Sequence, residues 1–204
     1  MRLRSQLLIF FLLFSSICLS QDMKEGFTYL ETGKYKEAEV FFKKILAEYP
    51  TNKTAKLCFG RAVGLNGDSK NAVVIFTDLL KKYPQDFEIK LNYAESLLWN
   101  KNFNKAKGYY KNLVKENSKS FPALLGYANT LSNLKIYDQA LEFVNKALLV
   151  SPGNLNALTS KKYIYLGYAN QYLQKRDYKT SIKLLNENLL LFENDTETLQ
   201  NLAN

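Results

Sequence analysis

The sequence predicts an all-α fold built from about five consecutive helical hairpins. The first observation is an alanine that recurs with a constant separation of 34 residues, a period typical of repeat proteins. These alanines are Ala38, Ala72, Ala106 and Ala140. The second observation is that apolar residues within each repeat are spaced by three and four, as on one face of an α-helix. Because one hairpin cannot bury its apolar face alone, neighbouring hairpins are expected to stack.

Residues 1–20 have the features of a secretory signal peptide. Two arginines stand near the start, an apolar run covers residues 7–19, and Cys18 and Ser20 form a small-x-small cleavage site. The apolar run is too short to span a bilayer as a helix. Two alternatives remain open: a retained membrane anchor, and a lipoprotein acylated at Cys18, which the bulky Ile17 disfavours. We expect export, to the periplasm or outer membrane of a bacterium or into the medium.

The composition argues against catalysis. The chain has 204 residues, a net charge of +9 and no histidine, which excludes histidine-based triads and most catalytic zinc sites. It also lacks a glycine-rich phosphate loop, a CxxC pair and a calcium-binding loop. We therefore expect no enzyme activity, no cofactor and no metal. Beyond residue 20 only Cys58 remains, so no internal disulfide is expected, and its apolar neighbours indicate a buried thiol.

The first repeat defines the elements of each predicted unit. Residues 22–32 and 35–48 are predicted helices, Gly33 allows the tight turn between them, and Pro50 ends the second. The corresponding turn and terminator positions of the next three repeats are Gly67, Lys101 and Lys135, and Pro84, Ser118 and Pro152. The predicted units are therefore residues 21–52, 53–86, 87–120 and 121–154.

The fifth unit, residues 155–195, contains seven extra residues. Tyr178 follows Tyr137 by 41 residues instead of 34. Seven residues are about two α-helical turns and preserve the buried face, so one long helix is predicted over Leu155–Lys175. A short capping helix is expected over residues 196–204. The long helix is interpreted either as a partner-contact element or as an extra packing segment.

The columns of the repeat resemble the tetratricopeptide repeat (TPR). The motifs that carry the resemblance are Gly26-x-x-Tyr29, Ala38-x-x-x-Phe42, Pro50, Phe59-Gly60, Ala72-x-x-x-Phe76 and Pro84. The resemblance covers residues 22–195, although the family's early tryptophan is missing. It implies a right-handed α-solenoid in which the first helices of successive units line a concave groove and bind a protein or peptide.

Carried over by register, the resemblance places nine side chains in this groove: Leu57, Arg61, Leu91, Glu95, Trp99, Leu125, Asn129, Leu166 and Asn170. The leucines follow one slot along the groove, or they simply pack between neighbouring first helices. Trp99 is the strongest candidate anchor, because tryptophan is enriched among residues that dominate binding energy.

The groove position that these leucines share also indicates which class of ligand the protein binds. Chaperone-binding members of the family place a clamp lysine there to hold a terminal carboxylate, so we exclude that class. The pattern favours an extended or helical segment with apolar anchors. The predicted function is a non-enzymatic scaffold or adaptor of the bacterial cell envelope. The alternative is an exported N-terminal TPR module, for sensing or docking, of a larger outer-membrane or signalling protein.

A cluster of lysines lies between Lys101 and Lys119. Residues 101–120 contain six lysines against Glu116 alone, a net charge of +5. Export argues against nucleic acid as the partner. Peripheral contact with an anionic membrane or an acidic partner is compatible with the cluster. A solvated outer helix face is the favoured interpretation.

Overall fold

The computed structural model describes residues 23–203, and all regular secondary structure in this range is α-helical. The prediction of an all-α fold is therefore confirmed. The predicted signal peptide, including Cys18, lies outside the described residues. The helices are α2 (Lys24–Glu31), α3 (Tyr35–Glu48), α4 (Lys53–Leu65), α5 (Ser69–Lys82), α6 (Phe87–Trp99), α7 (Phe103–Glu116), α8 (Phe121–Asn133), α9 (Tyr137–Val150), α10 (Leu155–Gln174), α11 (Tyr178–Leu191) and α12 (Thr196–Ala203).

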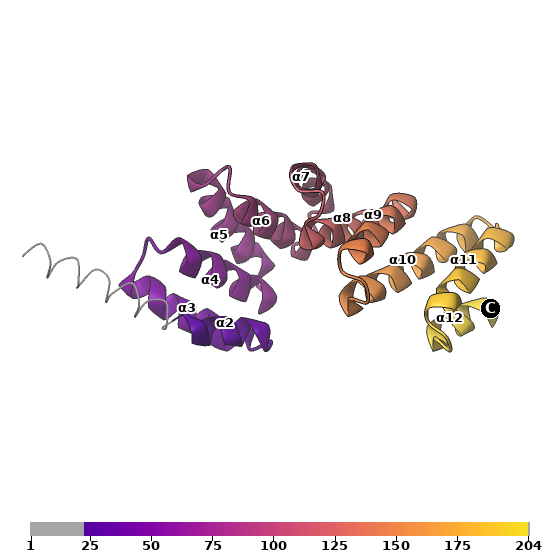
Figure 1. Cartoon of the computed structure of the whole chain (residues 1–204), viewed down its shortest axis with the longest axis horizontal. Helices are drawn as coiled ribbons and strands as arrows, with labels where there is room; N and C mark the ends of the chain where they lie inside the picture. Colours follow the sequence, from indigo (N-terminus) through magenta and orange to yellow (C-terminus); the bar gives the residue numbers. More distant parts are fainter. Residues whose placement is uncertain (1–22, 204) are drawn as a thin grey trace, which may run out of the picture. The chain divides into compact units, whose positions relative to one another are not determined.

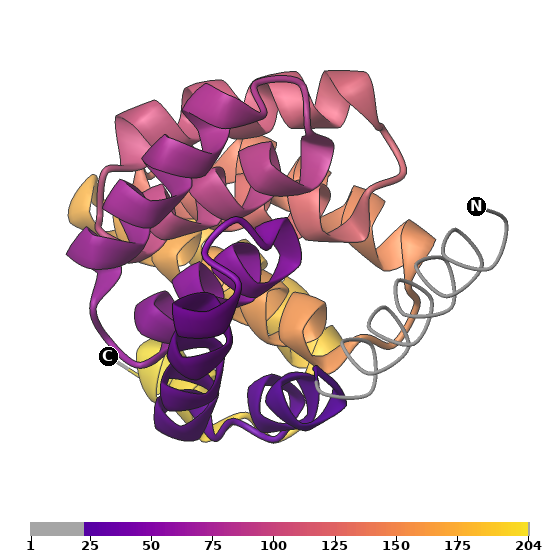
Figure 2. The same ribbon diagram turned by 90° about the vertical axis from the view of Figure 1, so that its left-hand side faces the viewer.

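Consecutive helices pack as hairpins, such as α4 with α5, α8 with α9 and α10 with α11 (Figures 1 and 2). Helices of successive hairpins also pack together, as α3 does against α4, α7 against α8 and α9 against α10. The contacts that define the fold are therefore formed between neighbours in the sequence, which is the arrangement of an α-solenoid.

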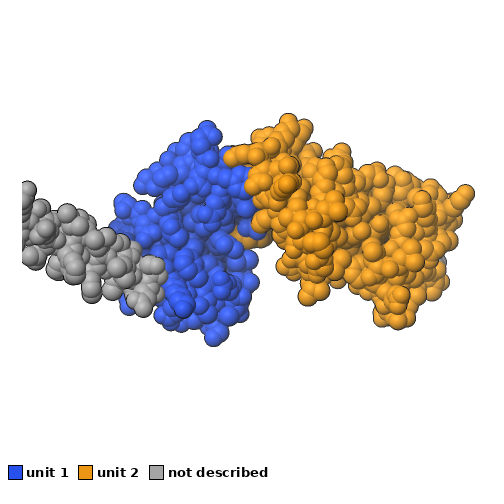
Figure 3. Space-filling model, viewed as in Figure 1, with its two compact units in different colours: residues 1–96 blue, residues 97–204 orange. Residues whose placement is uncertain are grey.

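The chain divides into two compact units (Figure 3). Unit 1 is Met1–Ser96 and unit 2 is Leu97–Asn204, with the boundary inside α6. Each unit is described by itself below. Among the helices that the structure describes, none combines the length and apolar character needed to cross a membrane.

From the second hairpin on, a polar residue directly before the first helix of the hairpin caps the N-terminus of that helix. In α4, Asn52 Oδ1 accepts a hydrogen bond from the Ala55 N–H at 2.9 Å. Such a cap satisfies a backbone donor that the helix itself leaves unpaired. The residues in this position, including the one before α12, are Asn52, Asp86, Ser120, Asn154 and Asp195.

Two of these caps also form ion pairs with a lysine 33 residues earlier in the chain. Lys53 pairs with Asp86, and Lys162 pairs with Asp195. Lys53 is the first residue of α4, whereas Lys162 lies two turns inside α10. Helix α10 has 20 residues and α4 has 13, so the predicted insertion is present, and its two extra turns precede Lys162.

Small residues, glycine or alanine, recur at fixed positions of the repeat and allow the two helices of a hairpin to approach closely. A Cβ atom built on Gly26 would lie 2.6 Å from Phe42 Cζ, and one built on Gly60 would lie 2.8 Å from Phe76 Cζ. Both rings are fully buried. The recurring alanine on the second helix, such as Ala72, is also fully buried. Any larger residue in these columns would push the helices apart.

The turns within the hairpins require a left-handed residue. Gly33 and Gly67 have φ values of 76° and 103°. Lys101, Lys135 and Arg176 occupy the equivalent position of later hairpins with φ values of 57°, 60° and 62°. The turn geometry is thus retained where glycine is replaced, at a backbone cost of about 1–2 kcal/mol per residue.

Candidate functional site

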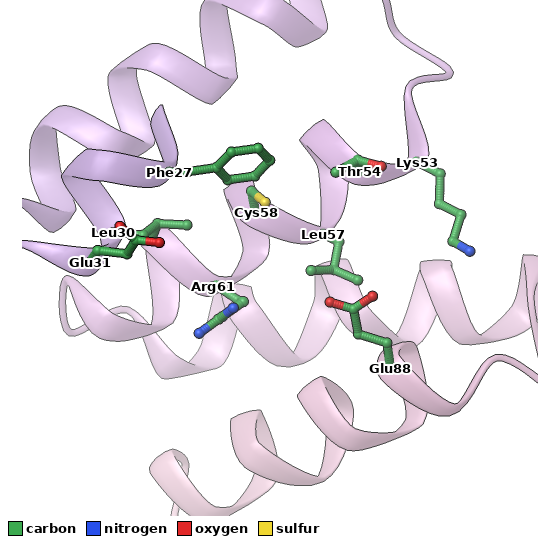
Figure 4. Close-up of a pocket in the computed structure, with 9 residues that line it drawn as sticks. All are labelled: Phe27, Leu30, Glu31, Lys53, Thr54, Leu57, Cys58, Arg61 and Glu88. Atoms are coloured by element: carbon green, nitrogen blue, oxygen red, sulfur yellow. The ribbon is translucent and has the colours of Figure 1, made fainter. Parts of the chain in front are cut away.

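Unit 1 carries a hollow of about 390 Å³ that is lined mainly by its first helices, α2, α4 and the start of α6 (Figure 4). Its floor is apolar and its rim is charged. The residues that line it are Phe27, Leu30, Glu31, Lys53, Thr54, Leu57, Cys58, Arg61 and Glu88. Two of the nine predicted groove residues, Leu57 and Arg61, therefore lie in one cavity.

Leu57 combines both roles that the sequence left open for the leucine slot. Its side chain is only 4% exposed, yet it contributes to the floor of the hollow. Phe27 from α2 faces the same space and is exposed. Phe27, Leu30 and Leu57 thus provide an apolar surface that a partner side chain would cover.

Arg61 is the central cation of this hollow. Its Nε atom is buried and has no hydrogen-bond partner within the described residues. Lys53, by contrast, is paired with Asp86, and the Lys53 hydrogen bond lowers the pKa of the Asp86 carboxyl. A buried guanidinium N–H without an acceptor is unfavourable by about 1–3 kcal/mol. Arg61 therefore has an unused donor beside the apolar floor.

Acidic side chains surround this cation. Glu31 from α2 and Glu88 from α6 line the hollow together with Arg61. Glu95 lies further along α6, where burial raises the pKa of its carboxyl and the nearby Arg61 charge lowers it in part. The net result is a raised pKa, so burial outweighs the attraction between Glu95 and Arg61.

The raised pKa of Glu95 gives a pH-dependent prediction. A carboxyl whose pKa is higher in the folded state contributes stability below its unfolded pKa and loses that contribution as the pH rises through the folded value. We expect Glu95→Gln, which mimics the protonated form, to increase the free energy of unfolding at about pH 7. The gain should disappear at about pH 4, where the native carboxyl is protonated. Urea denaturation at both pH values measures it, and an equal effect at both would contradict the assignment.

Cys58 also lines the hollow, but it is buried. Burial raises the pKa of its thiol to about 11, against a smaller opposing effect of Arg61. Because the thiolate is the reactive form, the thiol is largely unreactive at neutral pH. The expectation of a buried, inert thiol agrees with this environment.

Unit 2 carries a second hollow on its own first helices, with a volume of about 550 Å³. It contains two further predicted residues, Trp99 and Asn129, both partly buried. The full lining set is Leu98, Trp99, Lys101, Phe103, Asn129, Ser132, Asn133, Thr159, Ser160 and Tyr163. Aromatic rings beside amide and hydroxyl groups suit a segment that brings apolar side chains and exposed backbone polar groups.

The remaining predicted residues lie in neither hollow. Leu91, Glu95, Leu125 and Leu166 are partly buried, and Asn170 is exposed. Three further residues of this hollow, Thr159, Ser160 and Tyr163, were not predicted from the sequence and lie in the N-terminal half of α10. Thr159 and Ser160 lie in the insertion and have no counterpart in the 34-residue register, whereas Tyr163 follows it and corresponds to Thr54, Glu88 and Pro122. Partner binding by all nine residues stays a prediction.

The helical hairpins, their sequential packing and the hollows on the first helices define a helical repeat protein of the kind that presents extended binding surfaces. The family model described as Iml2/Tetratricopeptide repeat protein 39 matches residues 3–181. The chain belongs to this family, so the resemblance to the TPR is confirmed. TPR proteins are in general non-catalytic scaffolds that bind other proteins.

Solved structures share the fold. A tetratricopeptide repeat protein from Parabacteroides merdae ATCC 43184 superposes with a TM-score of 0.62 and 18% identity, over 90% of this chain and 70% of that chain. MamA from Desulfovibrio magneticus RS-1 superposes with a TM-score of 0.63 and 18% identity, over 86% of this chain and 96% of that chain. MamA AMB-1 superposes with a TM-score of 0.65 and 15% identity, over 84% of this chain and 98% of that chain. At these identities the likeness shows the fold alone. No curated protein matches the sequence.

Proposed function

We propose that this protein is a non-enzymatic adaptor of the bacterial cell envelope that holds a segment of another envelope protein against its first helices. The signal-like residues 1–20 support the assignment to the envelope. Within the part of the chain that the structure describes, no three Cys, Asp or Glu side chains form a group that could hold a metal.

The observation that carries the proposal is Arg61. Its buried Nε has no acceptor among residues 23–203, and apolar side chains form the floor beside it. A polypeptide segment meets both needs at once, because it brings an apolar side chain to the floor and a backbone carbonyl or carboxylate to the guanidinium. The rigid first helices hold these groups in place, so binding does not also have to order the receptor.

In-cell photocrosslinking tests the proposal. A photoreactive amino acid at Glu31 or Asn133, which line the two hollows and are exposed, is expected to crosslink to one protein that mass spectrometry identifies. The same amino acid at Val74 or Tyr178, exposed on second helices, is the control. Crosslinks to the same protein at equal yield from the control positions would contradict the proposal.

A double variant links the crosslink to the site. Phe27→Ala with Arg61→Gln removes the apolar anchor surface and the guanidinium. The yield from Glu31 is expected to fall by at least about tenfold, as for residues that dominate an interface. Circular dichroism should show unchanged helicity, because Phe27 is exposed and Arg61 is only partly buried. A folded double variant that crosslinks normally would move the interface away from unit 1.

A further inference from the structure

A third hollow, in unit 2, lies between the second helices α7 and α9 and does not share a residue with the two hollows above. Its volume is about 790 Å³. Leu124 of α8 and Val114 of α7 lie in it and are buried. The complete lining is Val114, Lys115, Ser118, Lys119, Leu124, Phe143, Lys146, Leu149 and Val150.

The charge of this hollow has one sign. Lys115, Lys119 and Lys146 line it, and none of the described residues that line it is acidic. Lys146 is paired with Glu142 at 2.5 Å and lies over the Phe143 ring. Lys115 and Lys119 are exposed at the end of α7 and just beyond it. The surface therefore attracts anions, and Lys115 and Lys119 are its two accessible cations.

Apolar side chains project from the same place. Leu149 is 81% exposed and Val150 is 43% exposed, both in the last turn of α9. Keeping a leucine in water is unfavourable in proportion to its apolar area. A protruding aliphatic side chain bordered by lysines matches a surface with an anionic outer layer and an apolar layer beneath it.

We propose that this surface, defined by Lys115, Lys119, Leu149 and Val150, docks on an anionic lipid bilayer. The two ammonium groups meet lipid phosphates, and Leu149 enters the boundary between headgroups and acyl chains. A bilayer fits better than an acidic peptide, because Leu149 borders the hollow yet is 81% exposed, so it projects into the surroundings instead of being enclosed by a peptide-sized slot. The proposal is independent of partner binding on the first helices and is compatible with both occurring together.

Vesicle flotation with the purified protein tests this surface. Vesicles of phosphatidylcholine mixed with phosphatidylglycerol are compared with pure phosphatidylcholine, and binding to the mixed vesicles is expected to be stronger. Each lysine near an anionic surface changes the partition coefficient by about fivefold, so Lys115→Gln with Lys119→Gln should reduce it by about 25-fold. Leu149→Ser should reduce it by about tenfold. Every variant has the same N-terminal segment, so any affinity of that segment is common to all.

The matched control is Lys70→Gln with Lys81→Gln, which removes the same charge from exposed positions of unit 1. It should weaken binding by less than about threefold, because only long-range attraction is lost. A loss equal to that of the Lys115/Lys119 variant would overturn the proposal. So would equal binding to both vesicle types. Immobilised polyglutamate that retains the protein through Lys115 and Lys119, while the mixed vesicles do not, would overturn it in favour of an acidic polypeptide.

Discussion

Phe76→Ala is expected to lower the free energy of unfolding by about 3–5 kcal/mol, the usual cost of deleting a buried aromatic ring. The Phe76 side chain is 0% exposed, and its ring fills the close approach between α4 and α5, with Cζ 2.8 Å from the position of a Cβ on Gly60. Alanine would leave a cavity that the two rigid helices cannot close.

Urea denaturation followed by far-UV circular dichroism measures this loss. Val74→Ala is the control, since Val74 lies on the same helix and is 59% exposed. Its effect should stay within about 0.5 kcal/mol. Similar losses in the two variants would mean that the Phe76 ring does not hold the hairpin together.

Gly126→Ala is expected to destabilise the protein by about 1–3 kcal/mol. The added Cβ would lie 2.4 Å from both Cε1 and Cζ of Tyr110, a fully buried ring. Neither the ring nor α8 can move without disturbing the packing around them. Gly108→Ala is the matched control, because, apart from the adjacent backbone of α7, no described residue lies within 4 Å of its Cβ position. It should stabilise that helix by about 0.5–1 kcal/mol.

A double-mutant cycle identifies the cause. In the Gly126→Ala background, Tyr110→Leu should cost less than it does in the native chain, because the smaller side chain relieves the overlap. The same denaturation measurement gives the coupling energy. Additive losses would show that Gly126 is needed for a reason other than its approach to Tyr110.

The repeat register was predictable because equivalent residues of the repeats have the same structural role in each copy. Ala38 and Ala72 are both fully buried where the helices of a hairpin cross. Pro50 and Pro84 both follow the end of a second helix. The seven extra residues preserved the helical face, so the length of α10 was also predictable.

The site was less predictable, because it depends on differences between copies. Leu57 and Arg61 share a hollow, but the register does not reveal that Arg61 Nε finds no acceptor in the part of the chain that the structure describes. Thr159 and Ser160 lie in the insertion and have no counterpart in the other repeats. Gly126 resembles any helical glycine until the ring of Tyr110 is placed against it.

The surroundings of the lysine cluster could not be predicted from the sequence either. In the sequence, Lys107, Lys111, Lys115 and Lys119 form one regular series. In the structure, Lys107 is partly buried, whereas Lys115 and Lys119 adjoin the exposed Leu149 of α9. Leu149 follows Lys119 by thirty residues in the chain, and the packing of both α7 and α9 against α8 makes the two lysines part of an amphiphilic surface.

Packing between neighbours in the chain has a consequence for synthesis and delivery. A hairpin such as α4 with α5 needs no distant residue to complete its main contacts. Loop closure is therefore short, and chains dominated by local contacts fold rapidly. Each new hairpin is therefore able to fold against the hairpin before it during synthesis, before the rest of the polypeptide has followed.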